Sequence, residues 1–173
     1  MEKNNLSDLD IVYKSEHAEL ATLLASQTEP ITALLPEPFV TSAMAKNENI
    51  RVLADLTDEW SKHTSNTPLS MGVMIARAEF LEQNEDAVLK FLEEYSKSTE
   101  YVNGNVAEAA TLSEKFDIMK SAIAEKAIPR CNIVCIKGDE MKSSAKQLLE
   151  IFYNANPKSV GGSLPDESFY YTK

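Results

Sequence analysis

The sequence predicts an α/β fold, because short apolar segments typical of strands alternate with helical patterns through its first third. Strand, helix, strand, helix and strand follow one another with short connections, which favours a parallel sheet with helices packed on it. A fourth strand-like segment comes after a polar stretch, and the rest of the chain is mostly helical in pattern. The segments expected to be strands are residues 11–13, 31–35, 50–56 and 71–76.

The first expected helix follows the strand at 11–13. Ser15 is placed to cap it, since a serine side chain can accept a hydrogen bond from the free backbone N–H groups of the first turn. Glu16 and Glu19 put negative charge at the positive end of the helix dipole. Apolar residues at helical spacing over 20–24 supply a face that packs on the sheet.

The second turn from strand to helix is the Pro-Glu-Pro segment that stops the strand at 31–35. Pro38 fits the first turn of a helix that continues through Met44, because the N–H that proline lacks would have no helical partner there. Glu37 is pinned between two prolines. Two interpretations of it stay open: it accepts a hydrogen bond from a cationic or amine ligand, or it favours the start of the helix electrostatically.

Residues 61–68, Ser-Lys-His-Thr-Ser-Asn-Thr-Pro, form the expected linker or hinge. Beyond the fourth strand, Asn84 is placed to cap a helix that begins with Glu85. Asn105 and Glu108 have the spacing of a capping box and open another helix. Further helices are expected over residues 119–127 and 141–152, before an irregular tail from residue 156.

Bulk composition excludes several classes of protein. A length of 173 residues and a hydrophobic content of 43% suit a globular domain with a core of its own. The formal charge is −10 and no cluster of Lys and Arg stands out, so nucleic acid is not an expected partner. No run approaches the roughly 20 apolar residues of a membrane-spanning helix. Residues 1–10 are polar and acidic, unlike the basic and apolar start of a signal peptide.

Cys131 and Cys135 lie in the apolar run 128–136 and are interpreted as small core side chains. An extended run keeps their Cα atoms about 13 Å apart, too far for a disulfide, whereas a helical run permits one. No ligand-spaced pair accompanies them, so no metal and no cofactor are expected. Either cysteine could pair with His17 or His63, but a cysteine buried in an Ile/Val run is usually inert. No catalytic residue is assigned.

The candidate ligand-binding residues lie at the two turns from strand to helix. In open α/β sheets, ligands bind beyond the carboxyl ends of the strands, where helix N-termini present free N–H groups. Ser15 and the Glu37-Pro38-Phe39 turn would lie on that edge; the alternative is that both turns are ordinary connections. Arg130 precedes an apolar run, and its planar fork would either hold a ligand carboxylate or phosphate or pair with a structural acid.

Five stretches of the chain share their order and spacing with one known family. They are residues 33–41 (Ala-Leu-Leu-Pro-Glu-Pro-Phe-Val-Thr), 71–73 with 79–80, 87–103, 127–133 (Ala-Ile-Pro-Arg-Cys-Asn-Ile) and the tail 156–171. Together they resemble the substrate-binding proteins of ABC importers, in the branch related to nitrate, sulfonate and thiamine-precursor binders. The resemblance covers nearly all of residues 8–171 and adds Asn132, beside Arg130, to the candidate ligand-binding residues.

The resemblance implies a periplasmic-binding-protein-like fold of type II, in which a small molecule is trapped in a cleft between two α/β lobes. Residues 8–60 would belong to the second lobe, 61–68 would cross between lobes, and 69–155 would return to the first lobe, mostly as helices. Residues 156–173 would be the C-terminal tail. Such proteins capture a solute outside the cytoplasm and deliver it to membrane permease subunits without chemistry on it.

The chain departs from the family pattern in having no export signal, no opening segment of the first lobe and no start of the second. We therefore expect a C-terminal fragment that self-associates or binds the missing N-terminal half. Two alternatives stay open. One is an enzyme related to the thiamine-pyrimidine synthases of the same fold, and the other is an interaction protein that reuses half of the fold.

Overall fold

The computed structural model describes residues 9–64 and 67–173, and they form two compact units. The first unit comprises the chain up to Arg51 together with Asn105–Asn132. The second comprises Val52–Gly104 and Ile133–Lys173. Residue 8, the first of the segment predicted to belong to the second lobe, and residues 65 and 66 of the predicted hinge lie outside the described residues.

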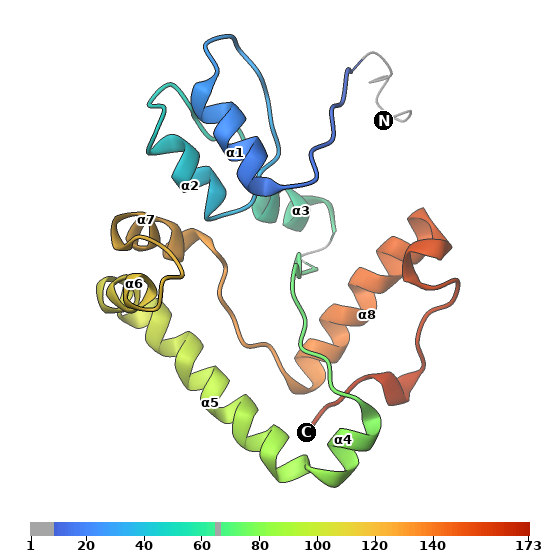
Figure 1. The fold of residues 1–173 in the computed structure, drawn as a ribbon. Coiled ribbons are helices and arrows are strands. Elements are labelled where there is room, and N and C mark those ends of the chain that lie inside the picture. Colours follow the sequence, from blue (N-terminus) through green and yellow to red (C-terminus); the bar gives the residue numbers. More distant parts are fainter. Residues whose placement is uncertain (1–8, 65–66) are drawn as a thin grey trace. The chain divides into compact units, whose positions relative to one another are not determined.

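The first unit is built from two pairs of helices. In the first pair, α1 (His17–Ser26) packs on α2 (Phe39–Met44). In the second, α6 (Val106–Lys115) lies beside α7 (Ser121–Ala127), which runs directly into the short 3₁₀ helix η2 (Ile128–Arg130). Figure 1 shows both pairs, and the packing of α2 against α7 joins one pair to the other.

Alanine dominates the core of this unit. Because the alanine side chain is a single methyl group, helices whose buried faces carry alanine can approach closely. Ala110 is 0% exposed, and Ala43 and Ala127 are each 1% exposed. The other buried apolar residues of the unit are Ala21, Ala109, Ala124 and Ile128.

Aromatic and polar contacts join α1 to α2 and to the segment that follows α2. The His17 and Phe39 rings lie 5.4 Å apart between centroids and are tilted against each other. Asn47 donates from Nδ2 to the carbonyl oxygens of Leu24, at 3.4 Å, and Gln27, at 3.2 Å. The Leu24 carbonyl also accepts the Gln27 backbone N–H at 3.3 Å, so Asn47 adds a second donor there and supplies one to the Gln27 carbonyl at the end of α1.

The second unit is also helical. Asp55 caps α3, where its carboxylate accepts a hydrogen bond from the Thr57 N–H at 2.8 Å. Tyr170 is 8% exposed, with the Lys146 ammonium above its ring. The elements of this unit are α3 (Leu56–His63), α4 (Ala78–Gln83), α5 (Glu85–Gly104), α8 (Gly138–Ala155), η3 (Pro157–Val160) and η4 (Glu167–Phe169).

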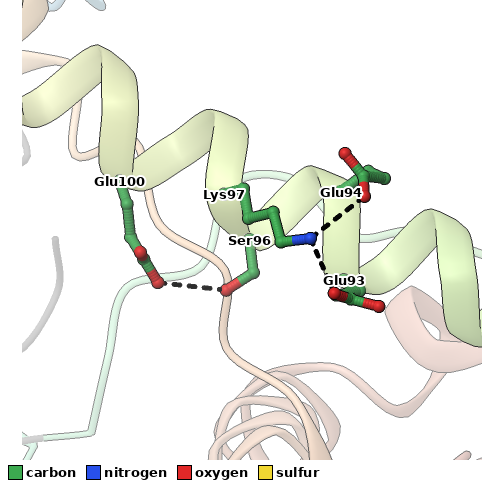
Figure 2. Close-up of polar contacts among 5 residues, drawn as sticks. All are labelled: Glu93, Glu94, Ser96, Lys97 and Glu100. Atoms are coloured by element: carbon green, nitrogen blue, oxygen red, sulfur yellow. Dashed lines mark hydrogen bonds and ion pairs between the residues drawn. The ribbon is translucent and has the colours of Figure 1, made fainter.

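The longest helix, α5, carries its charges on the surface. Figure 2 shows Lys97 between Glu93, at 2.6 Å, and Glu94, at 3.1 Å, with Ser96 donating to Glu100. These are pairs at spacings of three and four residues, which lie on one side of a helix and stabilise it by a few tenths of a kcal/mol each. These contacts stabilise α5, and we do not assign them to a ligand-binding site.

The predicted strands do not form a sheet, so the expected α/β class is not confirmed. Among the described residues no strand is present, and the segments 11–13, 31–35 and 71–76 are irregular. The fourth, 50–56, is irregular up to the start of α3. A strand is defined by hydrogen bonds to a neighbouring strand, and an apolar pattern predicts a suitable segment without supplying that neighbour. Val73 and Ile75 are accordingly 78% and 84% exposed.

Most predicted helices are present, but three predicted side-chain caps are not, since Asn84 donates from Nδ2 to the Phe80 carbonyl oxygen at 3.0 Å and does not cap α5. The helices near residues 17, 39, 85, 106, 121 and 138 lie where the sequence pattern puts them. Ser15, however, does not cap α1: the cap position is Glu16, without a side-chain hydrogen bond. Asn105 occupies the cap position of α6, also without a cap hydrogen bond from its side chain. In the described part of the chain, no helix is both long and apolar enough to cross a bilayer.

The alanine core predicts a sharp difference between two substitutions on α6. Ala110→Leu adds three carbons to a side chain that is fully buried between helices. The overpacking is expected to lower the free energy of unfolding by about 1–3 kcal/mol. Ala107→Leu, on the exposed side of the same helix, is expected to change it by no more than about 0.5 kcal/mol. Urea unfolding of both variants measures the difference, and equal effects would contradict the packing described.

Candidate functional site

A buried carboxylate marks the start of α2. The Glu37 side chain is 9% exposed, and its Oε2 accepts two hydrogen bonds from Thr41: one from the backbone N–H at 3.1 Å and one from the hydroxyl at 2.8 Å. Thr41 lies one helical turn beyond Glu37, so the local fold brings donor and acceptor together. The Glu37–Pro38 peptide bond is cis. Two donors on one oxygen hold the carboxylate in a fixed orientation.

Arg130 pairs with the other oxygen of this carboxylate. Its Nε lies 3.1 Å from Glu37 Oε1. The N–H does not point at the oxygen, and Oε1 has no well-aligned hydrogen-bond donor in the described chain, so the contact is an ion pair without a good hydrogen bond. The Arg130 side chain is 39% exposed, against 9% for Glu37. One end of the ion pair is thus buried, while the other reaches the surface.

A hollow of about 220 Å³ lies at this ion pair. Lys126 and Arg130 line it with positive charge, and Thr41 adds a polar group. Met44 and Ala45 supply its apolar part. All five lining residues belong to the first unit. Lys126 and Arg130 are four residues apart where α7 continues into η2, so a helical path presents them on the same side.

Cys131 lies within the influence of the same charges. Burial raises the pKa of its thiol, the Glu37 carboxylate raises it further, and Arg130 acts in the opposite direction. The thiol is therefore held in its protonated form, which is a poor nucleophile. Cys131 and Cys135 are both free and partly exposed, so the sequence-based interpretation of fully buried side chains is too simple.

The candidate residues predicted from the sequence fall into two groups. Glu37 and Arg130, assigned separately from the sequence, form the ion pair beside the hollow. Pro38 occupies the cap position of α2, and the Phe39 ring packs on His17. Two candidates lie apart from the lining of the hollow: Ser15 is exposed before α1, and Asn132 is exposed with a left-handed backbone, φ 50°.

Sequence reasoning missed Thr41, Met44, Ala45 and Lys126. A signal for two of them was present, because Thr41 and Lys126 are each four residues from a residue that was predicted. Met44 and Ala45 carry no chemical signal of their own. Among the residues that the structure describes, no group of three or more His, Cys, Asp or Glu side chains could hold a metal ion.

The fold is similar to that of an ABC transporter from Parabacteroides distasonis, known from a crystal structure, with a TM-score of 0.69. The two sequences are 24% identical, so the likeness concerns the fold alone. It covers 99% of this chain and 59% of the other, and this chain therefore spans less than two thirds of that protein's length.

At the level of sequence, the model of the menaquinone biosynthesis family matches residues 38–136. These are 99 of the 173 residues, and the chain belongs to this family. The matched segment contains every residue that lines the hollow and begins directly after Glu37. None of the curated proteins shows significant sequence similarity to the chain.

The double anchoring of Glu37 by Thr41 predicts the effect of removing one hydroxyl. Thr41→Val keeps the shape of the side chain and the backbone donor but leaves Oε2 with one hydrogen bond fewer. We expect the free energy of unfolding to fall by about 1–2 kcal/mol, because the lost bond has a charged acceptor. Thr111→Val, which removes an exposed hydroxyl bonded to a neutral carbonyl, is the control. Losses of the same size in both variants, measured by urea unfolding, would contradict the anchoring role.

Proposed function

We propose that this chain is the solute-binding component of an ABC-type importer, or a part of one, that captures a small molecule for delivery to membrane permease subunits. The similarity of fold to an ABC transporter, over 99% of this chain, carries the proposal. The hollow in the first unit supports it, because a few charged groups beside an apolar wall are typical of small-molecule sites.

The side chains around the hollow favour binding over catalysis. Glu37 is held by Thr41 and paired with Arg130, so its carboxylate is already engaged before any substrate arrives. The raised pKa of the Cys131 thiol disfavours the thiolate that nucleophilic chemistry would need. His17 packs on Phe39. These contacts support a protein that holds its ligand and releases it unchanged.

The proposed role has consequences for location and partners. A solute-binding component of this kind acts on the extracytoplasmic side of the membrane, next to its permease. Its ligand is a small solute, and neither a metal nor a cofactor takes part. The remainder of the binding protein, whether carried by the same polypeptide or by another, would add contacts to a ligand that the hollow already binds.

An enzyme that acts in menaquinone biosynthesis is the second candidate, and the match to that family over residues 38–136 favours it. In this alternative the same hollow would hold a substrate, and Arg130 and Lys126 would stabilise negative charge that develops during the reaction. The two candidates differ in one observable respect: a binding protein returns its ligand unchanged, whereas an enzyme converts it.

A screen of the full chain against small solutes, with recovery of each ligand, tests this proposal. At a concentration 100 times its dissociation constant, a solute that binds only the folded state stabilises it by about 2.7 kcal/mol, which a thermal melt detects. We expect at least one such solute, recovered chemically unchanged by mass spectrometry after prolonged incubation, without stoichiometric iron or zinc in the protein. Conversion of the bound compound would contradict the transport proposal and favour the enzyme.

A further inference from the structure

We infer that the hollow lined by Arg130 and Lys126 is a binding site for the carboxylate of a small organic acid. This inference deepens the proposed function and rests on it, because it names the class of ligand that the solute-binding component takes. Three properties of the site support it: a guanidinium whose terminal amino groups have no acidic partner in the described chain, an excess of positive charge and an apolar wall.

The guanidinium of Arg130 keeps donors free for a ligand beside its ion pair with Glu37. Thr41 fixes Glu37 through two hydrogen bonds to Oε2, and the other carboxylate oxygen lies 3.1 Å from Arg130 Nε. Arginine has five N–H donors in a rigid fork, of which Nε carries one. In the described chain the two terminal amino groups have no acidic partner, although Arg130 lines the hollow. A ligand carboxylate can therefore accept two parallel hydrogen bonds from these terminal amino groups.

The local charge favours an anion. Two cations, Lys126 and Arg130, line the hollow, and Glu37 offsets one of them. Lys126 forms no ion pair with an acid of the described chain, so one positive charge remains for a ligand. This local excess contrasts with the formal charge of −10 for the whole chain. A cationic solute would meet repulsion at this place.

The size and the wall of the hollow restrict the anion further. Its volume of about 220 Å³ is below the roughly 300–1,000 Å³ of most small-molecule pockets, so it fits a small molecule or one end of a larger one. Met44 and Ala45 give it an apolar side. Inorganic phosphate gains nothing from that surface, whereas an organic acid buries its carbon skeleton against it. The combination favours a carboxylate attached to an apolar body.

The test compares benzoate with benzamide, its uncharged counterpart, and with inorganic phosphate, by NMR titration of this chain. Benzoate is expected to bind, with shifts centred on Lys126 and Arg130, and benzamide and phosphate are each expected to bind at least tenfold more weakly. Benzamide or phosphate binding as tightly as benzoate would overturn the inference.

Variants of the two cations complete the test. Arg130→Lys keeps a charge beside Glu37 but removes the fork, and is expected to weaken benzoate binding at least tenfold. Lys126→Gln is expected to weaken it severalfold. Lys90→Gln, which makes the same charge change on the exposed surface of α5, is the control and is expected to leave binding unchanged. Equal effects of Lys126→Gln and Lys90→Gln would contradict the assignment.

The outcome separates this inference from the proposed function. If a neutral or cationic solute binds and benzoate does not, the carboxylate site is wrong and solute binding stands. If benzoate binds as expected but the chain converts its natural ligand, the carboxylate site stands and the transport proposal fails.

Discussion

Glu37 and Arg130 lie far apart in the sequence, and their side chains meet 3.1 Å apart in the first unit. Glu37 belongs to the turn that starts α2, and Arg130 ends the 3₁₀ helix that follows α7. Together with the packing of α2 on α7, this ion pair joins the two helical pairs of the unit. A carboxylate that is 9% exposed would cost several kcal/mol without partners. Thr41 and Arg130 together offset that cost.

The same contact links stability to binding. Because Glu37 contacts only the Nε side of Arg130, the interaction that neutralises a buried acid also keeps a cation at the rim of a hollow. An ion pair buried at both ends would leave nothing for a ligand. A fully exposed one would contribute little to stability, at about 0–1 kcal/mol, and would not keep a cation beside the hollow. The unequal burial of the two partners allows one contact to serve both purposes.

The sequence predicts the helices of this chain better than it predicts the class of fold or the site. Helices depend on local signals, such as the proline before Phe39 and the acids at Glu85 and Asp86, and those helices begin where the signals lie. The four expected strands do not form a sheet, because each strand needs a neighbouring strand to pair with. A local apolar pattern does not show whether that neighbour is present. Glu37 and Arg130 each stood out singly, but the ion pair follows from the packing of α2 on α7, which no local signal reveals.

A double-mutant cycle on Glu37 and Arg130 tests the central claim most directly. Urea unfolding of Glu37→Gln, Arg130→Gln and the double variant gives the coupling energy between the two side chains. Because the Arg130 side chain is 39% exposed, solvent screens part of the attraction, and we expect a coupling of about 1–2 kcal/mol, with the double variant more stable than the sum of the single losses predicts. A coupling indistinguishable from zero would show that the two residues act independently and would contradict this account of the unit and its site.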